Sequence, residues 1–135
     1  MIVADAALIA CFTVRNERSA LADAVCATDA VWAAPLLWRS ELRNVLAACQ
    51  RAHGLSQESA LLAMQAAEEV LGGREYRVAS EPVLELAARS KCTAFECEYV
   101  VLAQDLGVPL VTPDRRIVRA FPGTAVALER FTRKK

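Results

Sequence analysis

The stretch from Cys92 to Asp114 most limits the folds open to this chain, because it has the pattern of one helix followed by one short buried strand. Thr93 suits a helix N-cap, apolar residues then recur at helical spacing, and Gly107 ends the helix. Leu110-Val111 is a brief apolar run of the kind that a buried parallel strand shows. Thr112–Asp114 turns the chain out at the carboxyl edge of the expected sheet, which is where open α/β sheets place their chemistry.

The same alternation of short strands and longer helices runs through the rest of the chain. Apolar or alternating segments predict further strands at 2–4, 31–33, 76–78 and 125–128, the last of them at a sheet edge. Helical patterns predict helices at 6–10, 17–28, 35–53, 56–71 and 82–89, with Pro35 as a first helical residue. We therefore expect a single three-layer α/β/α domain over residues 1–135, with a mostly parallel, Rossmann-like sheet covered on both faces.

Composition favours a soluble cytoplasmic protein. Of 135 residues, 55% are apolar, so a real core is expected, yet no apolar run approaches the ~18 residues that a membrane span needs. The start of the chain, MIVAD, lacks the basic region of a secretory signal. The chain has 5 cysteines, an odd number without a CxxC pair, which predicts reduced thiols and argues against a sulfur-bound metal.

Four acidic residues fall at special places in this pattern. Asp5 follows the first strand, Asp114 follows the strand described above, Glu41 lies on the apolar side of helix 35–53, and Glu96 lies in the first turn of a helix. If the two strands are neighbours, their acids emerge at one edge of the sheet. Clustered carboxylates repel unless a cation lies between them, and Mg²⁺ or Mn²⁺ prefers oxygen ligands. The pattern predicts a metal site of the kind that serves phosphoryl transfer.

Each acid also has a purely structural interpretation. Asp5 suits the N-cap of the next helix, and the spacing of Thr93 and Glu96 is that of a capping box. Glu41 lies at the solvent boundary if its helix is rolled slightly; if it is buried, it needs an arginine, a proton or a metal, and Asn44 one turn on is placed to support it. The sequence leaves these alternatives open.

Basic residues are equal in number to acidic ones, but their placement is uneven. The chain has 16 of each, so no strongly basic surface is visible in bulk. Arg115, Arg116 and Arg119 closely follow Asp114, and the guanidinium group matches the geometry of phosphate. These three arginines are predicted to contact a phosphate-bearing ligand. The alternative is that the abundance of arginine in this chain reflects a genome rich in arginine and alanine codons.

The arrangement of the acids resembles that of the PIN-domain nucleases. It consists of Asp5 after the first strand, Glu41 in WRSELRNVL, Glu96 in TAFECEYVVLAQDLGVPLVTPD, and Asp114 in the final TPD. The resemblance covers nearly the whole chain and is greatest to the VapC-type toxins of type II toxin–antitoxin pairs. Its most specific segment is the helix, the turn at Gly107–Pro109 and the TPD strand end. One departure is that Glu96 stands where aspartate is more usual.

This resemblance implies a function and a set of partners. The four acids would bind Mg²⁺ or Mn²⁺ and hydrolyse phosphodiester bonds in RNA, and Thr112 is similar to a family hydroxyl that supports the site. Arg115, Arg116 and Arg119 would then hold RNA. The resemblance also implies a homodimer, and a cognate antitoxin whose tail enters the acidic groove with a basic residue near the metal site.

Three other classes of protein share parts of this pattern with the nucleases. A receiver-type signalling domain needs clustered acids after its first strand and a lysine after its last, whereas this chain has Asp5 alone and no suitable lysine. A phosphatase with an Asp-x-Asp motif is disfavoured because Ala7 stands at the second acidic position. A PIN-like protein without catalysis, which only binds a partner, remains open.

Overall fold

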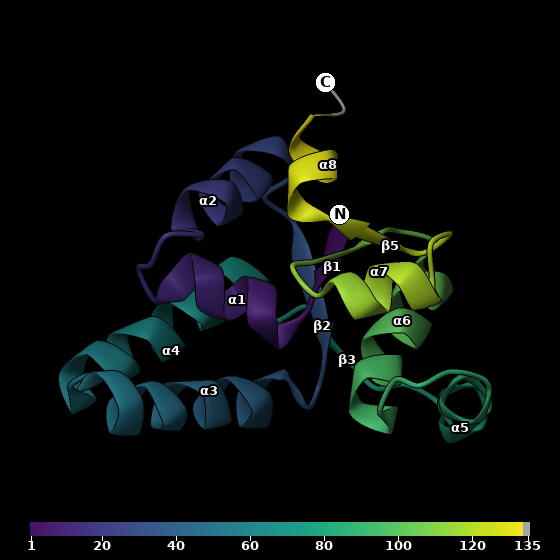
Figure 1. Ribbon diagram of the computed structural model, residues 1–135, viewed down its shortest axis with the longest axis horizontal. Coiled ribbons are helices and arrows are strands. Elements are labelled where there is room, and N and C mark those ends of the chain that lie inside the picture. The colour runs from purple at the N-terminus through teal and green to yellow at the C-terminus, as the bar shows by residue number, and fades with distance from the viewer. Residues whose placement is uncertain (134–135) are drawn as a thin grey trace.

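The computed structural model describes residues 1–133, and its centre is a five-stranded sheet (Figure 1). The strands are β1 (Ile2–Ala4), β2 (Trp32–Pro35), β3 (Glu75–Tyr76), β4 (Leu110–Thr112) and β5 (Ala125–Ala127). Their order is β3-β2-β1-β4-β5, and each neighbouring pair is parallel. The parallel α/β architecture predicted from the sequence is therefore confirmed.

Helices cover both faces of this sheet. They are α1 (Ala6–Thr13), α2 (Ser19–Thr28), α3 (Trp38–His53), α4 (Gln57–Leu71), α5 (Ser80–Arg89), α6 (Ala94–Leu106), α7 (Arg115–Ala120) and α8 (Leu128–Thr132). Helices α1, α2 and α4 lie on one side of the sheet, and α6 lies on the other with α5 packed outside it (Figure 1). Within residues 1–133, no helix is long and apolar enough to cross a lipid bilayer.

The strand order places a switch point beside β1. After β1 the chain builds the β2 and β3 side of the sheet, and it then returns to build β4 and β5 on the other side of β1. The register pairs Ala4 with Val111. Asp5, which follows β1, and Thr112, the last residue of β4, therefore lie at the same edge of neighbouring strands. In open α/β sheets, ligands bind at this kind of position.

The core explains why the strands are short and apolar. All three residues of β1 are fully buried, because helices cover both faces of the central strand. Trp32 and Trp38 are the largest fully buried side chains. The ring of Phe12 packs against that of Trp32 with centroids 5.1 Å apart. This core fixes α1 against the sheet and α3 against α1 and α4, and so fixes the residues at the N-terminal ends of α1 and α3.

One predicted helix boundary is wrong. Pro35 does not begin a helix; it is the last residue of β2, where it pairs with Tyr76 of β3, and α3 starts at Trp38. A proline lacks an N–H group and is tolerated at the end of a strand beside a short edge strand. The edge strand itself is Glu75–Tyr76, rather than 76–78 as predicted.

Two short helices, α7 and α8, are not predicted from the sequence. Their lengths are 6 and 5 residues, which is too short for an amphipathic period to show. The strand predicted at 125–128 lies at the sheet edge as expected, but it stops at Ala127, and Leu128 begins α8. The presence of α7 directly after Asp114 matters for the site, because it carries the three arginines that follow this acid.

Candidate active site

Asp5 is the most enclosed of the four predicted acids, with 6% of its surface exposed. Its Oδ1 accepts a hydrogen bond from the backbone N–H of Leu8 at 2.8 Å, so it does cap α1. Its Oδ2 accepts a hydrogen bond from the Thr112 hydroxyl. Burial raises the pKa of Asp5 to about 6 against the effect of these two bonds, and the charges of Asp114 and Glu41 raise it further. Asp5 is therefore a cap and also a carboxylate within reach of two other acids.

Thr112 joins the two acids that follow strands. It is fully buried, and its hydroxyl donates to Asp5 while it accepts a hydrogen bond from the backbone N–H of Asp114 at 3.0 Å. The Oδ1 of Asp114 in turn accepts a hydrogen bond from the backbone N–H of Arg116 at 2.9 Å and caps α7. One hydroxyl thus fixes the positions of Asp5 and Asp114 relative to each other.

Glu96 takes part in the capping box that its spacing predicts. Its Oε1 accepts a hydrogen bond from the backbone N–H of Thr93 at 2.9 Å, and the Thr93 hydroxyl accepts one from the backbone N–H of Glu96 at 3.1 Å. The other oxygen, Oε2, lies 2.7 Å from Nη2 of Arg116. Of the two carboxylate oxygens of Glu96, Oε2 therefore points away from the start of α6, toward Arg116 and Asp114.

Arg116 stands between two of the predicted metal ligands. Its Nη2 lies 2.7 Å from Oε2 of Glu96 and 3.1 Å from Oδ2 of Asp114. These two carboxylates raise the pKa of the guanidinium. Repulsion between the carboxylates is thus relieved by a side chain of the same protein. Of the three arginines predicted to hold RNA, this one is already engaged by ion pairs, whereas Arg115 and Arg119 are exposed and, within residues 1–133, form no ion pair.

Glu41 is held by a residue that the sequence pattern does not single out. The Tyr99 hydroxyl donates a hydrogen bond to Oε1 of Glu41 at 2.7 Å, and Tyr99 is only 2% exposed. Burial and then the charge of Glu41 raise the pKa of Tyr99, which keeps its proton on the hydroxyl. Asn44 is exposed, and within the described residues no hydrogen bond joins it to Glu41. The partner of Glu41 is therefore a phenol from α6.

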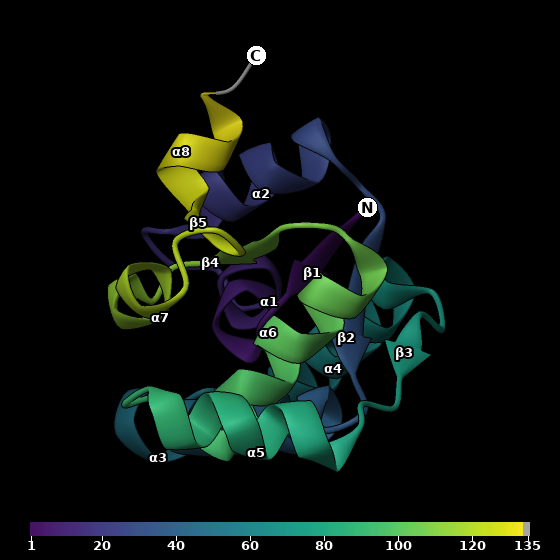
Figure 2. The same ribbon diagram turned by 90° about the vertical axis from the view of Figure 1, so that its right-hand side faces the viewer.

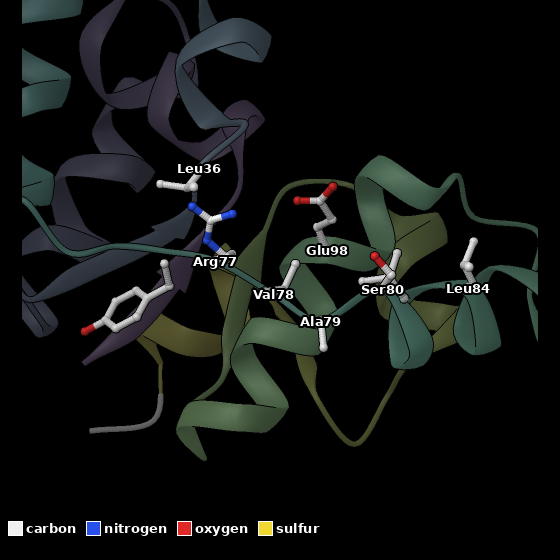
Figure 3. A pocket seen from close by; sticks show the side chains of 9 residues that line it. Leu36, Arg77, Val78, Ala79, Ser80, Leu84 and Glu98 are labelled. Atoms are coloured by element: carbon white, nitrogen blue, oxygen red, sulfur yellow. The ribbon is translucent and has the colours of Figure 1, made fainter.

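A further acid lies close to Glu41. Burial, and then the charge of Glu41, raise the pKa of Glu98. Glu98 lines a hollow of about 200 Å³ together with Leu36, the segment 76–80 and Leu84. Figure 3 shows Glu98 and Arg77 pointing to the same side of the segment that links β3 to α5. Glu98 directly precedes Tyr99 in the sequence. This position indicates that Glu98 is near Glu41 only after the hydrogen bond between Tyr99 and Glu41 is known.

The donor set suits a hard divalent cation, although these side chains are not gathered into a complete cage. Within residues 1–133, no three Asp, Glu, His or Cys side chains lie close enough together to hold a metal ion in this arrangement. The groups at the site are carboxylates and a hydroxyl, which is the chemistry that Mg²⁺ and Mn²⁺ prefer. The guanidinium of Arg116 already lies between Glu96 and Asp114, so the space between these two acids holds a positive charge. A divalent ion would compete with Arg116 for these two acids.

Comparison with known proteins supports the class of fold. No family model matches this chain, and no curated protein matches its sequence. Its structure is similar to that of PAE2754 from Pyrobaculum aerophilum, with a TM-score of 0.72 and 22% identity over 97% of this chain and 92% of that one. It is also similar to FitAcB from Neisseria gonorrhoeae, with a TM-score of 0.64 and 19% identity over 96% of this chain and 99% of that one. The chain has a three-layer α/β/α, PIN-like fold.

Proposed function

We propose that this protein is a Mg²⁺- or Mn²⁺-dependent endoribonuclease and the toxin of a toxin–antitoxin pair. The observation that carries the proposal is the linked set of Asp5, Thr112 and Asp114 at the switch point of a PIN-like sheet. Glu41 contributes to the raised pKa of Asp5, and Glu96 shares a cation with Asp114. These links support the proposal that the four acids of the sequence pattern act at one site.

In this proposal the chain holds and orients the reacting groups. Asp5, Glu41, Glu96 and Asp114 would hold the ion, which when bound supplies hydroxide at neutral pH and steadies the leaving oxygen of the phosphodiester. With a pKa of about 6, Asp5 is mostly ionised at neutral pH and so available as a ligand. Thr112 orients Asp5 by donating to it, and Tyr99 does the same for Glu41. Such donors behind ligands strengthen both affinity and geometry.

The proposal includes partners and a compartment. The proposed substrate is single-stranded or loop RNA, the proposed assembly is a homodimer, and the proposed location is the cytoplasm. Its regulator would be an antitoxin that presents a basic side chain to the acids. The ion pairs of Arg116 with Glu96 and Asp114 support that last part, because they show two of the acids binding a guanidinium.

The test is cleavage of single-stranded RNA by the purified protein with added Mg²⁺ or Mn²⁺. Asp5→Asn and Asp114→Asn should each lower the rate by about two orders of magnitude or more, because each removes a charged ligand oxygen. Glu41→Gln should act similarly. Glu69→Gln is the matched control, since Glu69 is an exposed acid on α4. Circular dichroism should show all four variants folded. Cleavage that persists in excess EDTA, or an Asp5→Asn protein of unchanged rate, would contradict the proposal.

A PIN-like protein that binds without cleaving is the second candidate. The observation that favours it is Arg116, which occupies the space between Glu96 and Asp114 as a permanent counter-ion would. Binding of RNA with no cleavage in either metal would select this candidate. Cleavage that appears in Arg116→Gln alone would instead show that Arg116 blocks a competent site.

A further inference from the structure

A basic hollow of about 370 Å³ lies beside the candidate active site. It is lined by the segment 89–92, which joins α5 to α6, and by Arg116, Arg119 and Ala120 of α7. Figure 2 shows α7 and this junction on the same side of the molecule. The lining contains Arg89, Lys91, Arg116 and Arg119 but no acidic residue. Four positive charges thus surround one concave space in a chain with a net charge of zero.

Three of these cations form no ion pair with any residue of the described part of the chain. Within residues 1–133, Arg89, Lys91 and Arg119 form no ion pair, although Glu85 precedes Arg89 by one helical turn. A concave site lined by one sign of charge concentrates ions of the opposite sign. The hollow is therefore suited to an anion.

The backbone of the hollow is held in place by hydrogen bonds. The Ser90 hydroxyl donates to the backbone carbonyl of Leu86 at 2.7 Å and accepts a bond from the backbone N–H of Cys92 at 3.2 Å. The Cys92 side chain is buried and anchors the start of α6. Arg89 and Lys91 therefore project from a fixed turn, so an anion that binds them orders less of the chain than it would on a loose loop.

Arg116 connects this hollow to the acids. The same side chain lines the hollow and lies 2.7 Å from Oε2 of Glu96 and 3.1 Å from Oδ2 of Asp114. A ligand that occupies the hollow and also reaches Glu96 and Asp114 must place negative charge in the hollow, next to the proposed site of phosphodiester cleavage. A nucleic acid strand has this form, because each phosphate is followed by another. Three of the four cations are arginines, whose planar forks match phosphate oxygens.

We propose that this hollow is a phosphate subsite, which holds a backbone phosphodiester of the RNA next to the one that is cleaved. The inference rests on the proposed function and deepens it, since it names where the substrate strand leaves the acids. Arg89, Lys91 and Arg119 bind the phosphate, and Arg116 forms the wall between the two places. Arg89 and Lys91 are additions to the arginines predicted from the sequence. Arg115 lies outside the subsite, in a second hollow that Arg119 also lines and that contains Glu129.

The test measures binding separately from cleavage. The probe is a fluorescent single-stranded oligonucleotide with 2′-O-methyl riboses, which resists cleavage, titrated with full-length protein in EDTA over a range of salt. The test variant is Arg89→Gln/Lys91→Gln/Arg119→Gln. The matched control is Arg15→Gln/Arg43→Gln/Arg51→Gln, which removes the same charge from exposed arginines outside the hollow. Removing one phosphate contact lowers the slope of log affinity against log salt by roughly 0.7 for a single strand, so the slope of the test variant should fall by about 2. The variant should also bind at least tenfold more weakly at about 0.1 M salt, and Arg89→Lys/Arg119→Lys should recover much of the slope.

Other outcomes would overturn the subsite. An unchanged slope in the test variant would show that these cations do not contact the RNA. An equal fall of the slope in the control variant would show that they act only through net charge. Displacement of the probe by oligo-glutamate as readily as by unlabelled RNA of matched charge would assign the hollow to an acidic protein. If the wild type cuts RNA in Mg²⁺ while the test variant binds normally, the subsite fails and the nuclease stands. If the wild type neither binds nor cuts RNA, both fail.

Discussion

The raised pKa of Asp5 gives a prediction about stability that does not depend on activity. The pKa is raised from 3.8 to about 6, chiefly by burial. At about 1.36 kcal/mol per pKa unit, keeping this carboxylate ionised lowers the free energy of unfolding by about 3 kcal/mol at neutral pH or above. Asp5→Asn removes this charge and retains an oxygen that can cap α1. It loses the acceptor for the Thr112 hydroxyl, which costs about 1 kcal/mol. We therefore expect the metal-free variant to be more stable than the wild type by about 2 kcal/mol at pH 7.

The direction of the pH dependence follows from the sign of the shift. Because the folded-state pKa is above the unfolded one, the unfavourable contribution of Asp5 is present in full above about pH 6 and is lost as the pH falls through that value. The wild type should thus gain relative to Asp5→Asn on acidification, and the advantage of the variant should vanish by about pH 4. Other carboxylates titrate in both proteins, so they cancel in the difference.

Urea unfolding of both proteins in EDTA, from about pH 4 to about pH 8, measures this difference. Added Mg²⁺ should favour the wild type, because a ligand that binds only the folded state stabilises it by mass action and the variant has lost a ligand group. A difference that stays constant with pH, or a variant that is less stable than the wild type at the alkaline end, would refute the reasoning. In that case Asp5 is an ordinary helix cap, and the electrostatic link to the other acids is absent.

Three further substitutions test individual residues. Tyr99→Phe removes the donor to Glu41, and isothermal titration with Mn²⁺ should show metal affinity reduced by about tenfold. Thr112→Val removes the donor to Asp5 from a fully buried place, so urea unfolding should show a loss of about 1–3 kcal/mol, and an unchanged midpoint would mean that this bond is not formed. Gly107→Ala meets no neighbouring atom but has a φ of 67°, so thermal unfolding should show a loss of about 1 kcal/mol from backbone strain alone.

The parts of the structure that could be predicted from the sequence are those with local causes. The buried central strands give continuous apolar runs, and the helices of ten or more residues give an apolar period. Asp5 and Asp114 are recognisable because they stand one and two residues after the ends of strands, and strand ends are marked by local turn residues. The capping box of Thr93 and Glu96 is likewise a relation between neighbours in sequence, and it is present as its spacing predicts.

The rest depends on packing between distant segments. Tyr99 and Glu41 are 58 positions apart, and their hydrogen bond exists only because α6 and α3 approach the same edge of the sheet. Arg116 reaches Glu96 because α7 forms directly after β4, and a helix of 6 residues leaves no periodic signal. For the same reason the sequence groups Arg115 with Arg116 and Arg119, whereas in the structure Arg115 and Arg116 line different hollows and Arg119 lines both.

The two carboxylate oxygens of Glu96 have different roles, since one caps α6 and the other pairs with Arg116. One oxygen closes the first turn of α6, so the side chain cannot rotate freely and offers its other oxygen in one direction only. The capping box accepts glutamate or glutamine at this position, and the longer arm reaches back to Thr93. Glu96 thus ties the start of a helix to the charge of the site. Glu96→Gln keeps the helix start and removes the charge, whereas Glu96→Ala removes both. The difference between these two variants isolates what the cap contributes to folding, and the difference between the wild type and Glu96→Gln isolates the contribution of the charge.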